Sequence, residues 1–334
     1  MNKRCLGNLE VSEIGMGCMG FSHGYGKVPE EAYSIDAIRS AYDFGCTFFD
    51  TAETYGREQF YPGHNEELVG KALEPFRGHV VLATKFHLAP EEYTGPGTLF
   101  DVISRHLAAS MKRLRTDCID LYYLHRVNEQ IPLEEIAQVM GRMIREGKIR
   151  GWGLSQVSAS VLDRAHQVTP VSAVQNLYSM MERDCEREIF PYCLEHGIGV
   201  VPFSPIASGF LSGKVTAATA FEGDDVRKFV PQLSPENLAA NQPILDLLAR
   251  FSQAKHATSA QISLAWMLHK YPNAVPIPGS KNRERILENL GASQVSLTDL
   301  EFEELENALD ACTVHGHRGI DESEQNSFSK HWRK

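Results

Sequence analysis

The chain has 334 residues, of which 43% are hydrophobic and 23% are charged, and its formal net charge is −10. These values are typical of a globular protein with one large domain or two smaller ones. The negative charge argues against general binding to nucleic acid or anionic membrane, and the sequence has no apolar run that predicts a signal peptide or a membrane span.

The first 17 residues predict a short hairpin that turns near Gly7-Asn8, followed by a strand that runs through Ile14. The next segment, Gly15-Met16-Gly17-Cys18-Met19-Gly20, matches the dinucleotide fingerprint G-x-G-x-x-G. A Rossmann turn has to open directly into a helix whose N-terminus holds the pyrophosphate. Residues 21–29 instead predict a loop, so we do not interpret the match as a Rossmann turn.

From Glu31 onward the chain alternates between predicted helices and strands. Apolar residues at helical spacing, with start signals such as Thr98-x-x-Asp101, predict the helices, and short apolar runs predict the strands. The predicted helices are 31–44, 65–73, 98–114, 133–144, a short helix after Ser158, 184–196, 235–253, 258–270, 282–290 and a last one from Thr298. The predicted strands are 46–50, 79–85, 118–125, 149–154, 171–175, 198–203 and 273–277.

Together with the strand through Ile14, this pattern gives eight strands, each followed by a helix, without a break in composition. It favours a closed barrel over an open doubly wound sheet. We therefore predict one α/β domain over residues 1–334, a (β/α)₈ TIM barrel with an N-terminal β-hairpin and extra C-terminal helices. Its core would span about 6–310. The polar tail at 311–334, with its three histidines (His315, His317 and His331), predicts a loosely packed terminus or, alternatively, a lid.

Three predicted strands end in residues that can carry chemistry: Asp50, Lys85 and His125. Tyr55 follows Asp50 in a short loop, and the C-terminal strand ends of a barrel meet at one face. Lys85, held by Asp50, would lower the pKa of Tyr55, and His125 would orient a reacting oxygen. Tyr55 could then protonate an oxyanion as it forms, which carbonyl reduction by hydride transfer requires.

Each of these residues alone also has a structural interpretation, as a packed tyrosine, a solvated lysine, a buried histidine or a turn-capping aspartate. The position of all four on barrel strand ends and loops favours a chemical role. The sequence has no H-E-x-x-H and no H-x-H at an early strand end, so we predict no metal site. The seven cysteines form no Cys-x-x-Cys pair, and Cys185 and Cys193 lack a second pair of ligands. We expect reduced thiols in a cytoplasmic protein.

The motifs around these residues resemble those of the aldo-keto reductase family, from about Leu6 to about Leu309. The matching segments are Phe49-Asp50-Thr51-Ala52-x-x-Tyr55-Gly56, Ala83-Thr84-Lys85, Asp120-Leu121-Tyr122-Tyr123-Leu124-His125-Arg126 and Glu146-Gly147-Lys148-Ile149-Arg150. The resemblance implies a catalytic tetrad of Asp50, Tyr55, Lys85 and His125. It also implies reversible, NADPH-dependent reduction of aldehydes and ketones to alcohols.

The resemblance carries over to several residues that would bind NADP(H). Ser155, Gln156 and Gln175 stand where the family holds the nicotinamide carboxamide, with Gln156 in place of the usual asparagine. Phe203 stands where an aromatic ring stacks on the nicotinamide. Further candidate contacts are Gly20 and, in a segment similar to the one that covers the pyrophosphate, Ser204, Pro205, Ile206, Gly209, Leu211, Gly213 and Lys214.

A second cofactor segment runs from Ile277 to Asn289. Ser280 precedes a predicted helix, whose free N–H groups attract phosphate. Lys281, Arg283 and Arg285 add cations where the helix dipole disfavours them, so an anionic ligand is the better explanation.

The resemblance assigns this segment to the adenosine end of NADP(H). It implies that Ser280 and Arg285 contact the 2′-phosphate and that Glu288 and Asn289 contact adenine. Gly279 stands where some members use a lysine on the same phosphate. Lys281 or Arg283 would then compensate for that lysine, and the preference would be for NADP(H).

The substrate would be a small carbonyl compound or alcohol. The rim of its pocket is expected to include the loop at about 207–234 together with Met19, His23, Tyr25, Phe86 and Arg126. One alternative is a non-catalytic, cofactor-binding regulatory subunit, as among the channel β-subunits that resemble this family. Another is a hydrolase with paired carboxylates, which would need a second strand-end acid facing Asp50. The oligomeric state stays open.

Overall fold

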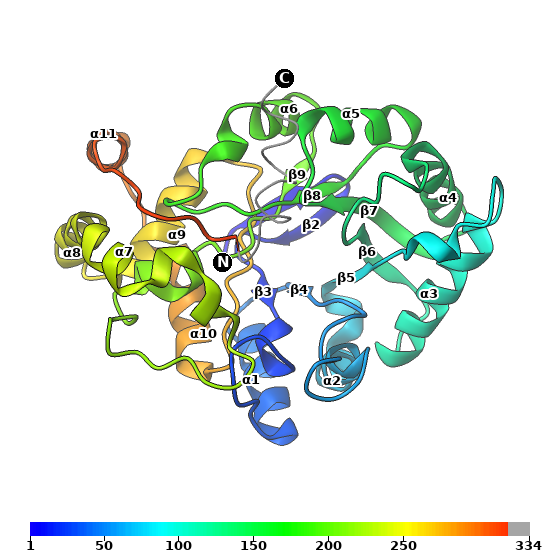
Figure 1. Cartoon of the computed structure of the whole chain (residues 1–334), viewed down its shortest axis with the longest axis horizontal. Helices are drawn as coiled ribbons and strands as arrows, with labels where there is room; N and C mark the ends of the chain where they lie inside the picture. The colour runs from blue at the N-terminus through cyan, green and yellow to red at the C-terminus, as the bar shows by residue number, and fades with distance from the viewer. Residues whose placement is uncertain (320–334) are drawn as a thin grey trace.

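The computed structural model describes residues 1–319, which form an α/β barrel with its strands at the centre and helices around them (Figure 1). Within these residues the parallel sheet has seven strands, in the order of the chain. They are β3 (Met16–Gly17), β4 (Phe48–Asp50), β5 (Val81–Phe86), β6 (Ile119–Leu124), β7 (Ile149–Ser155), β8 (Ala173–Gln175) and β9 (Gly199–Val200). The helices are α1 (Glu31–Asp43), α2 (His64–Leu73), α3 (Leu99–Arg113), α4 (Leu133–Arg145), α5 (Ala159–Val168), α6 (Ile189–Glu195), α7 (Pro235–Ala240), α8 (Gln242–Lys255), α9 (Ser259–Lys270), α10 (Arg283–Leu290) and α11 (Asp299–Asp310). None of the helices in the described part of the chain is long and apolar enough to cross a membrane.

An extended segment, 273–279, closes the barrel in place of a regular eighth strand. It makes isolated parallel bridges from Ala274 to Val200 of β9 and from Gly279 to Gly17 of β3. Proline has no backbone N–H, so Pro276 and Pro278 cannot donate to a strand ladder. The predicted strand 273–277 therefore has the right place in the barrel but only fragments of strand pairing.

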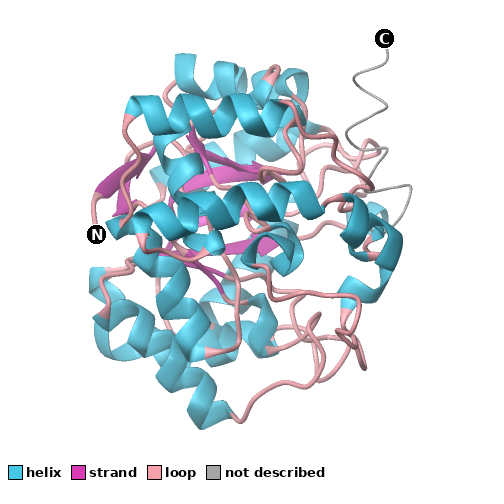
Figure 2. Ribbon diagram, turned by 90° about the vertical axis from the view of Figure 1, so that its left-hand side faces the viewer, coloured by secondary structure: helices cyan, strands magenta, loops and turns pink. Residues whose placement is uncertain are grey.

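The N-terminal hairpin covers the end of the barrel at which the strands begin. β1 (Lys3–Leu6) pairs antiparallel with β2 (Leu9–Ser12), and Leu6, Leu9 and Val11 are buried among inward-facing strand residues. Figure 2 shows the N-terminus at one end of the molecule and the long loops at the other. The opposite end of the barrel, at which the strands terminate, is therefore not covered by the hairpin, and a site can form there.

The predicted (β/α)₈ barrel with its N-terminal β-hairpin and extra C-terminal helices is confirmed, but several boundaries were wrong. The first barrel strand is Met16–Gly17 and does not end at Ile14. The predicted helix 184–196 consists of a 3₁₀ turn, Asp184–Glu186, followed by α6. The predicted helix 235–253 is divided into α7 and α8 at Asn241, because Pro243 fits the first turn of a new helix but not the interior of a continuous one. His331 lies outside the described residues.

Candidate active site

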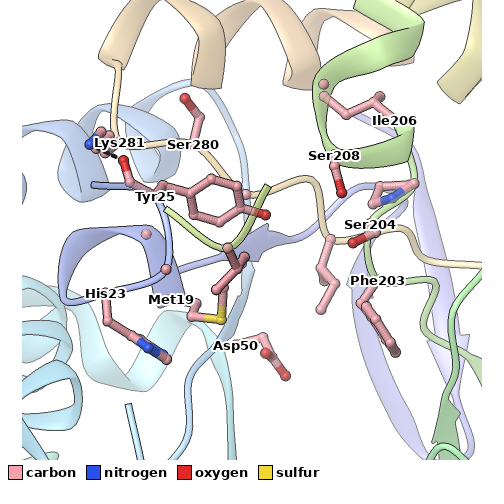
Figure 3. Close-up of a pocket in the computed structure, with 18 of the residues that line it drawn as sticks. Met19, His23, Tyr25, Asp50, Phe203, Ser204, Ile206, Ser208, Ser280 and Lys281 are labelled. Carbon is pink, nitrogen blue, oxygen red and sulfur yellow. Dashed lines mark hydrogen bonds between the residues drawn. The ribbon is translucent and has the colours of Figure 1, made fainter. Parts of the chain in front are cut away.

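A cavity of about 540 Å³ opens at the C-terminal ends of the strands. Its walls come from the strand ends, the loop after β3 (residues 18–30), the segment 203–230 and the start of α10. In Figure 3, Met19, His23 and Tyr25 extend into this cavity from the loop after β3, with Asp50 at its base.

Asp50, Lys85, Tyr55 and His125 lie together at this cavity. Asp50 and Lys85 form an ion pair that is fully or almost fully shielded from solvent. The ammonium of Lys85 also donates to the carbonyl of Thr51 at 2.8 Å and to the hydroxyl oxygen of Tyr55 at 3.3 Å. Asp50, Tyr55 and His125 line the cavity, and Lys85 lies behind them.

Burial decides the protonation of Tyr55. It raises the pKa of the hydroxyl above its ordinary value, and the attraction of Lys85 opposes this without cancelling it. From the sequence we predicted a lowered pKa for Tyr55, because the sequence shows that Lys85 is charged but not how deeply Tyr55 is buried. The hydroxyl therefore keeps its proton at neutral pH, as a proton donor must.

In the ion pair behind Tyr55, Asp50 and Lys85 each favour the charged form of the other. Burial alone would lower the pKa of Lys85, but Asp50 and Tyr55 raise it above its ordinary value. Burial raises the pKa of Asp50, and Lys85 and a hydrogen bond from Gln175 oppose the rise. The Tyr55 hydroxyl oxygen therefore lies 3.3 Å from a buried positive charge.

His125 presents a neutral ring to the same place. Burial lowers its pKa well below the ordinary value, helped by the positive charge of Arg126. Its ring meets the Tyr55 ring edge-on, with centroids 5.8 Å apart. A neutral imidazole carries one N–H, which it can donate to an oxygen held beside the tyrosine hydroxyl.

Phe86, which was predicted to line the substrate pocket, packs in the core instead. Successive side chains of a strand point to opposite faces. Because Lys85 faces the barrel interior, Phe86 faces the helices, where it is fully buried and stacks on Tyr122 with ring centroids 4.7 Å apart. His87, the next inward position, lines the cavity.

The ends of β7, β8 and β9 bring Ser155, Gln175 and Phe203 to the cavity wall. The Gln175 amide nitrogen donates to Asp50 Oδ2 at 2.8 Å, and Ser155 Oγ accepts from Arg126 Nη1 at 3.2 Å. Gln175 therefore links the wall to the buried ion pair.

Gln156 does not reach the cavity, contrary to the prediction. Its backbone has a positive φ of 56°, and its side-chain oxygen accepts a hydrogen bond from the Leu177 N–H at 2.9 Å. The amide therefore joins the ends of β7 and β8. The longer side chain of Gln156 therefore does not occupy the place expected for an asparagine.

Most of the predicted covering segment lines the cavity, through Ser204, Pro205, Ile206, Gly209 and Lys214. Leu211 and Gly213 do not. Leu211 is fully buried, and Gly213 ends a 3₁₀ turn, Ala207–Ser212, in the left-handed conformation. Ser208 and Ser212 take their places in the lining.

The start of α10 lies along the same cavity. The predicted contacts Gly20, Gly279, Ser280, Lys281, Arg285, Glu288 and Asn289 all line it. Glu288 pairs with Lys214 across the cavity at 2.6 Å. The ammonium of Lys281 donates to the carbonyls of Tyr25 and Lys27 at 2.5 Å each, and Arg283 turns to Asp36 of α1 at 3.3 Å. Arg283 is not among the residues that line the cavity.

Met19, His23, Tyr25 and Arg126 line the cavity as expected, and further residues join them that the sequence did not indicate. These are Gly17, Gly24, Thr54, Arg57, Glu58, His87, Ala260 and Arg318. Ser208, Ser212, Val226 and Arg227 also line the cavity and belong to the loop 207–234 that was expected at the rim, and Ile277 begins the second cofactor segment. The positions of Arg57 and Glu58 at the cavity could have been predicted from the sequence, because they follow Tyr55 in the same loop. No sequence pattern indicated Arg318, which lies in an irregular segment after α11.

Two irregular segments, the loop 207–234 and the start of the C-terminal tail, contribute to the cavity wall. Residues from 208 to 227 line one side. After α11, the backbone of His315 exchanges two hydrogen bonds with the Asn241 side chain, at 2.8 and 2.9 Å. The Arg318 N–H donates to Glu182 at 2.5 Å. The start of the tail is thus fixed against the barrel, and it brings Arg318 to the cavity.

His106 of α3 joins two loops beside the cavity. Its Nδ1 lies 2.8 Å from Glu53 and its Nε2 lies 3.0 Å from Glu92. The hydrogen bond to Glu53, assisted by the charges of both acids, raises the pKa of His106 to about 9. The folded protein therefore holds this proton more tightly than the unfolded chain, where a histidine titrates near ~6.5.

The stabilisation from protonated His106 should be complete below pH ~6.5 and should be lost as the pH rises through about 9. We expect the free energy of unfolding to fall by roughly 1 kcal/mol over this range, after allowance for screening by solvent. Urea denaturation at several pH values measures it. His106→Gln should flatten the pH dependence, and the same change at the exposed His79 should not. Equal slopes in the parent and His106→Gln would contradict the assignment.

Comparison with known proteins agrees with this geometry. The sequence model described as "Aldo/keto reductase family" matches residues 13–310. The chain is 36% identical over 315 residues to "Probable aldo-keto reductase 1" of Glycine max, covering 93% of this chain and 89% of that protein.

Two solved structures are also similar. The glycerol dehydrogenase of Gluconobacter oxydans has a TM-score of 0.81 at 25% identity, covering 96% of this chain and 97% of its own. An aldo/keto reductase of Klebsiella pneumoniae, solved in complex with NADP and acetate, has a TM-score of 0.70 at 26% identity, covering 93% of this chain and 96% of its own. The chain described here therefore belongs to the aldo/keto reductase family.

Proposed function

We propose that the protein reversibly reduces an aldehyde or ketone to the alcohol with NADPH, and that Tyr55 is the general acid and base. The observation that carries the proposal is the contact between the Tyr55 hydroxyl oxygen and the buried Lys85 ammonium, 3.3 Å apart at the wall of the cavity. Family membership supports an oxidoreductase, and the relative with bound NADP supports the cofactor.

The residues of the cavity fit NADP(H). Ser280, Lys281 and Arg285 lie at the start of α10, where cations oppose the helix dipole unless an anion is bound. They would hold the phosphate groups at the adenosine end. Ser155 and Gln175, with Phe203 beside them, offer polar groups and a ring for the nicotinamide end.

The chemistry divides between the cofactor and the chain. When bound, NADPH supplies the hydride. The Tyr55 hydroxyl donates a proton to the carbonyl oxygen as negative charge develops there, and Lys85 stabilises the phenolate that remains. Asp50 keeps Lys85 charged and in place. The neutral ring of His125 donates a hydrogen bond to the same oxygen and fixes its direction. In alcohol oxidation the phenolate takes the proton back.

An absorbance assay with 4-nitrobenzaldehyde and either nicotinamide cofactor tests the proposal. We expect NADPH to be oxidised, and more efficiently than NADH. If the protein binds NADPH yet reduces no carbonyl in a broad panel, it is the regulatory subunit instead. The hydrolase alternative has little support, because the carboxylate oxygens of Asp50 accept from Lys85 and Gln175.

Arg285→Ala should raise the KM for NADPH about tenfold or more while leaving the KM for NADH nearly unchanged, because the lost charge would face only the 2′-phosphate. Arg283→Ala is the matched control, since that guanidinium pairs with Asp36, and it should change neither value. Equal effects of Arg285→Ala on both cofactors would remove the role assigned to this arginine.

A further inference from the structure

We infer that Asn65 is a positioning residue for the proposed reaction, because it holds Tyr55 and the loop after β3 in a fixed arrangement around the cavity. The inference rests on the proposed function and adds a further residue to it. Asn65 is the second residue of α2 and is fully buried. It is not among the residues that line the cavity, so it can act only through the groups that it holds.

The side chain of Asn65 uses its oxygen and both of its N–H groups. Its Nδ2 lies 2.9 Å from the Cys18 carbonyl oxygen and 2.8 Å from the Ser22 hydroxyl oxygen, and its Oδ1 lies 2.6 Å from the Thr51 hydroxyl oxygen. A carbonyl oxygen can only accept, so the amide nitrogen faces Cys18 and the amide oxygen accepts from Thr51. An ionised aspartate of the same shape cannot donate, and a leucine has no polar atoms. An amide of this size is therefore needed to join the three groups.

On one side, Asn65 holds the segment that carries Tyr55. Its side chain fixes Thr51, whose carbonyl accepts from the Lys85 ammonium at 2.8 Å. Its backbone N–H donates to the Tyr55 carbonyl at 3.3 Å. Asn65 therefore bonds to both ends of the segment 51–55, which supplies the proton donor and an acceptor that holds Lys85.

On the other side, the same amide holds the beginning of the loop after β3. Cys18 and Ser22, which accept from the amide nitrogen, flank Met19 and Gly20 of the cavity wall. The Cys18 N–H also donates to the Asp50 carbonyl at 2.9 Å. One buried amide thus fixes this part of the wall relative to the segment that carries the proton donor.

Such a connection matters because carbonyl reduction delivers a hydride and a proton to adjacent atoms of one substrate. A displacement of about 1 Å can cost about a hundredfold in rate. The Tyr55 hydroxyl also has to keep its 3.3 Å contact with Lys85. A buried amide contributes to stability as well, since its loss leaves polar groups without partners. The experiment therefore has to separate the rate of the chemical step from the amount of folded protein.

Single-turnover oxidation of bound NADPH by 4-nitrobenzaldehyde makes this separation, because the rate constant reports the chemical step and the amplitude reports the fraction of competent protein. Asn65→Leu keeps a similar volume and removes the three side-chain hydrogen bonds. It should lower the rate constant about ten- to a hundredfold at unchanged amplitude. NADPH affinity, measured by quenching of intrinsic fluorescence, should change less than about threefold. Asn273→Leu is the matched control, because that amide donates to the Ile198 carbonyl at 3.0 Å, at the end of the barrel where the strands begin. It should keep the parental rate constant.

Thr51→Val is a second variant that keeps the carbonyl bonded to Lys85. It removes only the hydroxyl that donates to Asn65, and it should lower the rate constant about three- to tenfold at full amplitude. The double variant should be no slower than Asn65→Leu alone, because both changes remove the same hydrogen bond. Urea denaturation of the parent, the two single variants and the double variant should show the same non-additivity in the free energy of unfolding.

If both single variants lower only the amplitude, or if Asn65→Leu does not fold and Thr51→Val keeps the parental rate constant, Asn65 has a structural role alone. The inference is then wrong and the proposed function stands. If the parent binds NADPH but oxidises it with no carbonyl in a broad panel, the proposed function fails and the inference fails with it.

Discussion

Replacing Tyr55 by phenylalanine should lower kcat for carbonyl reduction by about 10²- to 10⁴-fold, the usual contribution of a positioned general acid. The change removes one hydroxyl group and keeps the ring between His23 and His125. Lys85 keeps its ion pair with Asp50 and its hydrogen bond to the Thr51 carbonyl. The loss should therefore appear in the chemical step and not in folding.

Binding measurements separate this effect from a damaged site. The candidate cofactor contacts lie on other strands and on α10, so NADPH affinity, followed by quenching of intrinsic fluorescence, should change less than about threefold, roughly 0.6 kcal/mol. Tyr61→Phe is a matched control, because that hydroxyl is exposed and donates to Glu67. It should retain the parental rate. If Tyr55→Phe reduces aldehydes as fast as the parent, Tyr55 is not the acid.

The sequence was sufficient to predict that Asp50, Lys85 and His125 lie close together, because strand geometry fixes where these residues go. Asp50, Lys85 and His125 each end an apolar run, and a barrel gathers those ends. The alternation of side chains along a strand would also have predicted the position of Phe86. Since Lys85 must face inward to reach Asp50, Phe86 must face outward, so the error at Phe86 was avoidable from the sequence.

Other features depend on contacts that no local pattern encodes. Gln156 looked equivalent to an asparagine because its amide has the same chemistry, but a positive φ and the Leu177 N–H direct it elsewhere. Lys281 and Arg283 looked interchangeable as phosphate ligands. Their real positions are set by the carbonyls of the loop after β3 and by Asp36, which are more than two hundred residues away in the chain. Such long-range partners require the fold.

Lys85→Met should reduce kcat about as much as Tyr55→Phe, for a different reason. Without the ammonium, the phenolate that forms on proton transfer has no buried positive charge beside it, and the buried hydroxyl becomes a weaker acid. This variant should also unfold more easily. It leaves Asp50 buried with only Gln175 and no cation, and removing one partner of a buried pair typically costs about 3–5 kcal/mol.

The pH dependence and a double variant distinguish these two consequences. In Lys85→Met, burial raises the pKa of Asp50 with no ammonium to oppose it, so the folded protein binds this proton more tightly than the unfolded chain. The destabilisation should therefore grow as the pH rises and shrink in mild acid. Adding Asp50→Asn removes the unpaired charge, so it should restore much of the free energy of unfolding measured in urea without restoring the rate. If the double variant recovers both, Lys85 acts only through stability. If Lys85→Met is fully active, the charge beside Tyr55 has no part in the chemistry.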